Sequence, residues 1–233
     1  MPSKVFAIVP AAGHGTRIGD VLPKQYLPLA GKPMMFHSLE ALAAVERIQR
    51  ILVVLSPLDQ HWEAQDWGKL DKRVEAHYIG GATRAASVSA GLLALEGSAA
   101  EDDWVLVHDA ARPCIQTLLI EQFLDELEED LVGGLLALPL SDTWKSADDT
   151  QRVANTVPRE KLWRAQTPQM FRYGRLKKAL PAHPDATDEA QAIEASGARP
   201  RLVSGESTNL KVTFAEDLQL AELILGSRNR VRL

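Results

Sequence analysis

The chain is poor in cysteine, lacks a long apolar run and carries no excess of positive charge, and each shortage excludes a class of protein. Cys114 is the single cysteine among 233 residues, so one chain can form neither a disulfide framework nor a cysteine-rich zinc site. No apolar run approaches the length of a membrane span. The formal net charge of −5 argues against a surface that coats nucleic acid. We expect a cytoplasmic protein without a membrane or nucleic-acid partner.

Short apolar runs recur along the chain and alternate with stretches of helical spacing. The runs are 5–9, 51–55, 74–79, 104–108 and 132–138. Continuous apolar strands that alternate with helices predict a mostly parallel sheet covered on both faces. We therefore expect one α/β domain over residues 1–233, doubly wound and Rossmann-like. Its ligand should lie at the carboxyl ends of the strands.

A loop of small residues and cations, residues 10–17, follows the first predicted strand. Gly13 and Gly15 let the backbone approach a ligand closely, and Arg17 adds positive charge. Lys24 adds a second cation shortly afterwards. A dinucleotide fingerprint needs a third glycine that this loop lacks at the required position, and no Walker sequence follows. The loop therefore predicts a nucleotide site of another kind.

A second motif begins where another predicted strand ends. Gly80 and Gly81 close that strand, and Thr83 is the expected N-cap of the next helix. Read alone, the motif indicates a well-capped turn between strand and helix. Arg84 or Ser87 can face a pocket from the first turn of that helix. The motif gains weight because it lies, like the first loop, at the edge where ligands bind.

A third motif, residues 107–113, places an aspartate at the end of a strand. Asp109 follows that strand on a loop of small residues, where one carboxylate with phosphate oxygens and water can hold Mg²⁺. His108 should point the opposite way, since side chains alternate along a strand. Arg112 either clamps a phosphate or forms a buried structural ion pair. Cys114 fits a buried thiol better than a nucleophile.

The alternation breaks at residues 139–160. Two polar strands, 143–147 and 152–157, flank a turn and predict a β-hairpin. An isolated hairpin is marginally stable in water, so it must pack on something else. We predict an arm that docks on a second subunit; a hairpin folded back on its own domain is the alternative. The basic tail from residue 227 onward is expected to fray.

These motifs recur together with several further segments in one order and spacing. The segments are Asp142-Thr143, Arg159, Thr167-Pro-Gln169, Thr187-Asp-Glu-Ala190 and Asn209-x-Lys211-Val-Thr213. Over essentially its whole length the chain resembles the 2-C-methyl-D-erythritol 4-phosphate cytidylyltransferase family. The resemblance implies transfer of CMP from CTP to methylerythritol phosphate, with release of pyrophosphate, in the non-mevalonate route to isoprenoid precursors. It also implies a homodimer in which each arm reaches the neighbouring site.

The resemblance assigns roles to residues of this chain. The nucleotide would lie against Ala11, Ala12, Gly13, Gly15, Gly81, Ala82 and Ser87. The catalytic cations would be Arg17, Lys24, Lys211 and Arg159. The methylerythritol phosphate would contact Arg112, Thr143, Arg159, Thr167 and Lys211. Asp109 would carry Mg²⁺ or another divalent metal.

Two other functions remain open at this point. A relative that cytidylylates ribitol 5-phosphate would use the same sheet and loops, although Ala110-Ala111 favours the methylerythritol enzyme. A non-catalytic nucleotide sensor is the second alternative. Against the sensor stand a magnesium carboxylate at Asp109 and the paired cations Arg17 and Lys24, which a sensor does not need together.

Overall fold

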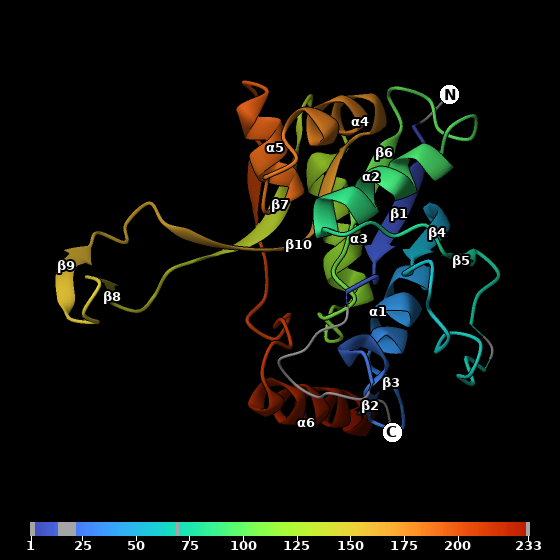
Figure 1. Cartoon of the computed structure of the whole chain (residues 1–233), viewed down its shortest axis with the longest axis horizontal. Coiled ribbons are helices and arrows are strands. Elements are labelled where there is room, and N and C mark those ends of the chain that lie inside the picture. The colour runs from blue at the N-terminus through green and yellow to red at the C-terminus, as the bar shows by residue number, and fades with distance from the viewer. Residues whose placement is uncertain (1–2, 14–21, 69, 232–233) are drawn as a thin grey trace.

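A central sheet organises the molecule in a computed structural model that describes residues 3–13, 22–68 and 70–231 (Figure 1). Within these ranges seven strands pair in the order β11-β7-β10-β6-β1-β4-β5. The elements are β1 (Val5–Pro10), η1 (Lys24–Tyr26), β2 (Pro28–Leu29), β3 (Lys32–Pro33), α1 (Met34–Ala43), β4 (Ile48–Val54), β5 (Val74–His77), α2 (Arg84–Ala94), β6 (Trp104–Val107), α3 (Thr117–Leu127), β7 (Gly133–Pro139), β8 (Trp144–Ala147), β9 (Val153–Val157), β10 (Trp163–Arg172), α4 (Tyr173–Ala182), α5 (Glu189–Ala195), β11 (Arg201–Ser204) and α6 (Ala215–Val231).

The sheet is mostly parallel, which confirms the predicted fold class. β1 pairs in parallel with β4 and β6, and β11 pairs in parallel with β7. β10 is the exception, because it runs antiparallel to both β6 and β7. The sequence did not predict β10, since the polar residues 166–169 interrupt its apolar pattern. Those polar residues belong to the site described below.

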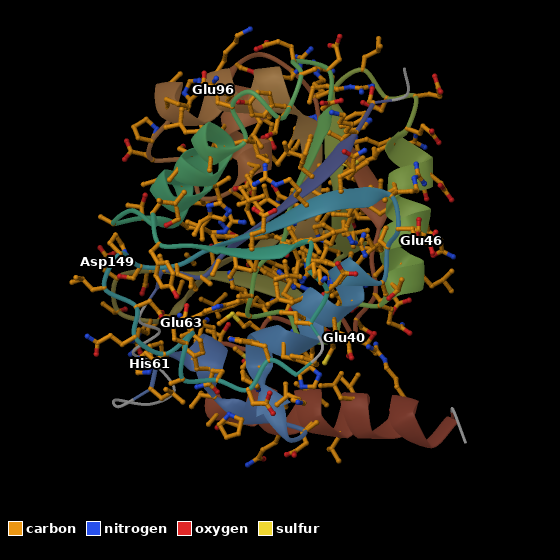
Figure 2. The ribbon with its side chains drawn as sticks, turned by 90° about the vertical axis from the view of Figure 1, so that its right-hand side faces the viewer. Glu40, Glu46, His61, Glu63, Glu96 and Asp149 are labelled. Atoms are coloured by element: carbon orange, nitrogen blue, oxygen red, sulfur yellow. The ribbon has the colours of Figure 1, made fainter. Side chains whose placement is uncertain are left out.

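Helices cover both faces of the sheet, and the side chains of β1 pack alternately against the helices on one face and on the other. Val5, Ala7 and Val9 belong to the core cluster that includes residues of α1 and α3. Phe6 and Ile8 belong to the opposite cluster, with residues of α2, α4 and α5. Figure 2 shows α2 and α3 on opposite sides of the strands. A strand buried on both faces needs apolar residues at every position, which is the pattern of residues 5–9.

The predicted hairpin is present as β8 and β9, which pair antiparallel and project away from the body of the molecule (Figure 1). Its apolar side chains are unusually open: Trp144 is 47% exposed and Val153 is 65% exposed. Both side chains are accessible to a partner. The docking of this arm on a second subunit stays a prediction.

The C-terminal segment forms α6, which lies below the sheet in Figure 1 and continues to Val231. The part of the expected frayed tail that the structure describes, residues 227–231, is helical. Arg228 anchors the helix because its guanidinium donates to the Cys114 carbonyl at 2.7 Å and to the Thr208 hydroxyl at 3.1 Å. Cys114 is buried against this helix, and burial raises the pKa of its thiol to about 11. Among the described helices, none has the length and apolar character needed to cross a membrane.

Candidate active site

A pocket of about 680 Å³ opens beside the carboxyl ends of β1 and β6. It brings together residues that lie far apart in the sequence. Its walls include the predicted nucleotide, catalytic and metal residues Ala11, Ala12, Gly13, Lys24, Gly81, Ala82, Ser87, Lys211 and Asp109. Gly15 and Arg17, predicted for the same site, lie outside the described residues. Their roles, like those of the other site residues, stay predictions.

Helix α2 begins at the pocket with the expected cap. The Thr83 hydroxyl accepts the Ala86 amide at 3.1 Å, which satisfies one of the free donors in the first turn. The Ser87 hydroxyl lies 3.0 Å from the Thr83 carbonyl and accepts the Gly81 amide at 3.2 Å. Ser87 is thus a brace for the glycine turn as well as a residue of the pocket wall.

The first and second loops touch each other at Gly80. A Cβ added there would lie 2.3 Å from the Cβ of Ala12 and 2.7 Å from the Leu55 carbonyl oxygen. The Gly80 amide donates to that same carbonyl at 2.7 Å. Only glycine allows this approach, which holds the two nucleotide loops against one another.

The turn that carries Lys24 is fastened to the same loop by residues that the sequence analysis did not assign. The buried Gln25 amide donates to the Ala11 carbonyl at 2.8 Å. Tyr26 donates to Asp59 at 2.9 Å, on the loop after β4 where Figure 2 shows His61 and Glu63. Lys24 donates to the Val212 carbonyl at 3.2 Å. In the sequence, Gln25 and Tyr26 belong to the segment Pro23-Lys24-Gln25-Tyr26, in which only Lys24 received a role.

Four charged side chains form a connected row, of which three line the pocket and the fourth is buried behind them. Lys211 Nζ lies 2.8 Å from Asp109 Oδ2, and Arg84 Nε lies 2.9 Å from Asp109 Oδ1. Arg84 also makes a bidentate pair with Glu189, at 2.6 and 3.0 Å. The row is called the charged row below: Glu189, Arg84, Asp109 and Lys211.

The charged row keeps Asp109 ionised. Burial by itself would raise the pKa of the Asp109 carboxyl, but Arg84 and Lys211 hold that pKa well below its usual range. The pKa of Arg84 is raised in turn, because Glu189 and Asp109 outweigh the effect of its burial. The sequence analysis placed Glu189 in the segment Thr187-Asp-Glu-Ala190 but gave it no role, because it lies 105 residues from Arg84 along the chain.

The chemistry of Asp109 is compatible with the magnesium ion that was predicted for it, and this role stays a prediction. Within the described ranges, no group of three or more His, Cys, Asp or Glu side chains could enclose a metal. Magnesium suits a single ionised carboxylate whose remaining ligands are phosphate oxygens and water. Each oxygen of Asp109 bonds one cation and keeps a second lone pair. The donor set therefore matches a metal shared with a substrate phosphate.

His108 is not among the described residues that line the pocket, whereas Asp109 is, and the His108 ring bonds to the turn and to β10 instead. Its Nε2 lies 3.3 Å from the Arg112 carbonyl, which can only accept, so this nitrogen carries the proton. Nδ1 then accepts from the Thr167 hydroxyl at 3.1 Å, and that hydroxyl accepts the Asp109 amide at 3.0 Å. This chain of hydrogen bonds fixes the start of the turn through β10.

A smaller pocket of about 160 Å³ adjoins the first, and Arg84, Asp109 and Lys211 line both. Arg112 and Thr167 also line it. The Arg112 guanidinium donates a buried hydrogen bond to the backbone carbonyl of Asn209 at 2.8 Å. Burial lowers the pKa of Arg112. Three predicted substrate residues, Arg112, Thr167 and Lys211, therefore meet at this pocket.

The other two predicted substrate residues lie on the arm. Thr143 and Arg159 are exposed and do not line either pocket among the described residues. Arg159 donates to the Ser141 carbonyl at the base of the arm. With the arm placed as it is here, they contribute to neither pocket of their own chain.

Comparison with known proteins identifies the relatives of this chain. Residues 5–227 match the family model IspD, 2-C-methyl-D-erythritol 4-phosphate cytidylyltransferase. The enzymes of that name from Azoarcus sp. strain BH72 and Dechloromonas aromatica strain RCB are each 56% identical, over 97% and 96% of this chain and 96% and 98% of theirs. A crystal structure of 4-diphosphocytidyl-2C-methyl-D-erythritol synthase is 36% identical, with a TM-score of 0.86 over 97% of this chain and 100% of that one. The cytidylyltransferase from Thermus thermophilus is 32% identical, with a TM-score of 0.76 over 96% of this chain and 98% of that one.

Proposed function

Because this chain belongs to the 2-C-methyl-D-erythritol 4-phosphate cytidylyltransferase family, we propose that its two adjoining pockets carry out that reaction. The enzyme transfers CMP from CTP to 2-C-methyl-D-erythritol 4-phosphate. The products are 4-diphosphocytidyl-2-C-methyl-D-erythritol and pyrophosphate, and the step belongs to isoprenoid precursor biosynthesis by the non-mevalonate route.

The observation that carries this proposal is the sharing of Arg84, Asp109 and Lys211 between the two pockets. CTP occupies the larger pocket, with its base against Gly81 and Ala82 and its triphosphate toward Lys24. The methylerythritol phosphate occupies the smaller one. The charged row then lies where the two phosphates must meet.

The chemistry requires positioning and charge neutralisation more than proton transfer. An oxygen of the methylerythritol phosphate attacks the α-phosphorus of CTP; the new P–O bond forms as the bond to pyrophosphate breaks. That oxygen is already ionised at neutral pH, so no strong general base is needed. Lys24 and Lys211, with Arg17, neutralise the two anions and the departing pyrophosphate. Asp109 would hold the magnesium ion, which would neutralise phosphate charge when bound.

The working enzyme is a homodimer that exchanges arms. The open apolar side chains of the arm, Trp144 and Val153, support this proposal. The exposure of Thr143 and Arg159 supports it too, since neither lines a pocket of its own chain within the described residues. In the dimer they complete the methylerythritol phosphate site of the neighbour. We place the enzyme in the cytoplasm.

The direct test is pyrophosphate release from CTP and Mg²⁺ with each of two polyol phosphates. Release with methylerythritol phosphate is expected, with little or none from ribitol 5-phosphate. Release with ribitol 5-phosphate alone would overturn the substrate. Nucleotide binding without release in either reaction would instead indicate a sensor.

A further inference from the structure

Glu189 is a fully buried carboxylate at the first residue of α5, with 0% of its side chain exposed. It is not among the described residues that line either pocket. Its two oxygens accept hydrogen bonds from the two terminal nitrogens of Arg84, at 2.6 and 3.0 Å. This bidentate geometry fixes the plane of the guanidinium and leaves its Nε–H directed at Asp109.

The backbone around Glu189 is itself fastened to β10. Asp188 caps α5 by accepting the Gln191 amide at 2.8 Å. Gln169 of β10 accepts the Ala190 amide at 2.8 Å and donates to Asp188 at 3.0 Å. The carboxylate therefore cannot drift from Arg84 without breaking bonds on both sides. Its position is set by the same strand that carries Thr167.

A carboxylate buried this deeply costs free energy, and a buried ion pair is weak evidence of a stabilising role. Burial raises the pKa of the Glu189 carboxyl, and the charge and hydrogen bonds of Arg84 oppose that shift. Both oxygens accept from the guanidinium, which is the geometry of an ionised carboxylate. Along the charged row the signs alternate from Glu189 to Lys211, and the four charges sum to zero. Without the charge of Glu189, Arg84 has only Asp109 to neutralise it. The guanidinium then competes for the carboxylate that a divalent cation needs.

We propose that Glu189 is a positioning residue of the reaction. It holds Arg84 and neutralises it, so that Asp109 keeps its affinity for the divalent cation that accompanies CTP. The proposal rests on the proposed function, because it assigns Asp109 to that metal. It predicts that loss of the Glu189 charge weakens metal binding specifically, while the affinity of the site for an anion is kept.

The test is calorimetry of CTP binding to the full-length protein across a series of Mg²⁺ concentrations. Glu189→Gln should raise the Mg²⁺ concentration at half-maximal binding by about tenfold, the lower end of the range for residues that support a metal ligand. Metal-free CTP should bind as tightly as to the wild type, or more tightly, because the site gains positive charge. Glu194→Gln, on the exposed side of the same helix, is the matched control and should change neither quantity.

Two further variants separate this role from a structural one. In Arg84→Gln combined with Glu189→Gln, the competing cation is gone, so the Mg²⁺ midpoint should return toward the wild-type value. A residue that only supports the fold would give no such recovery. If Glu189→Gln does not fold, Glu189→Asp serves in its place: its shorter side chain cannot keep both bonds, and it should shift the midpoint in the same direction by less.

An unchanged Mg²⁺ midpoint in Glu189→Gln or Glu189→Asp would overturn the proposal. So would an equal loss of CTP affinity with and without metal. These outcomes differ from failure of the proposed function, in which the wild-type protein releases no pyrophosphate. The binding measurement needs only CTP and Mg²⁺, so it reports on Glu189 whichever second substrate is used.

Discussion

At the residue scale, Gly80 decides whether the two nucleotide loops can meet. In Gly80→Ala the new methyl group would collide with Ala12 and with the Leu55 carbonyl, and backbone has no flexible end that could move aside. We expect a loss of roughly 1–3 kcal/mol in unfolding free energy, the usual cost of overpacking, together with weaker CTP binding. Urea unfolding and calorimetry measure the two effects.

The control for that change is Gly226→Ala in α6. A Cβ added at Gly226 meets nothing within 4 Å, so neither stability nor CTP affinity should fall. If Gly80→Ala behaved like this control, the close contact between the loops would have no energetic weight.

His108 makes the stability of the folded protein depend on pH. Its complete burial lowers the pKa of the imidazole from 6.5 to about 4, so the folded protein holds it neutral. As the pH falls below 6.5, the His108 imidazole is protonated in the unfolded chain but stays neutral in the folded chain. Stability contributed by this residue is therefore full above pH 6.5 and is lost toward pH 4, by up to roughly 3 kcal/mol.

This pH dependence can be measured by urea unfolding at pH 7 and pH 5. The stability lost between them should be smaller in His108→Asn than in the wild type. The matched control is His183→Gln, at the end of α4, which should leave the difference unchanged. An equal loss in His108→Asn and the wild type would show that His108 does not set the acid sensitivity.

At the element scale, helix α1 is closed by a residue from a distant loop. Arg73 donates to the Val45 carbonyl at 3.0 Å and to the Ile48 carbonyl at 2.6 Å, and it also bonds the Ala43 carbonyl. These carbonyls lie at or just beyond the end of the helix, where the last turn leaves its acceptors unpaired. The guanidinium therefore joins α1, the start of β4 and the segment before β5.

We expect Arg73→Ala to lower the free energy of unfolding by roughly 1–3 kcal/mol, because several carbonyls lose a charged donor at once. Arg73→Lys should restore only part of this, since an ammonium cannot reproduce the planar fork. Thermal and urea unfolding measure the change, with the neighbouring exposed Lys72→Ala as control. Full recovery in Arg73→Lys would contradict the role of the fork.

Element boundaries show where local sequence patterns stop being informative. The apolar runs located β1, β4, β5, β6 and β7, because each run falls on a strand of the central sheet. The sequence did not predict β10, because the polar residues that it contributes to the site interrupt the apolar pattern of a buried strand. The sequence did not predict the length of α6 either, because Arg228 bonds to Cys114 and Thr208, which are distant in the sequence.

At the scale of the whole molecule, the arm decides how many chains make one site. Lys24→Ala and Arg159→Ala should each be inactive as homodimers. A heterodimer of the two, purified through different affinity tags, has one site with both residues intact if arms are exchanged. It should therefore show about half of the wild-type activity.

The opposite topology gives a different result. If each arm folded back on its own domain, every site in that heterodimer would lack one of the two residues. Activity would then stay at the level of the single variants. Pyrophosphate release by the heterodimer distinguishes these arrangements directly.

The sequence by itself determined the fold class, the three loops at the strand ends and the position of Asp109, because strand period, glycine turns and alternation of side chains are local properties. It did not determine which charges surround Asp109. Arg84 and Glu189 are 105 residues apart, and their pairing depends on how α5 packs against β10. Contacts between distant segments follow from the packing of whole elements, so only the tertiary structure could decide them.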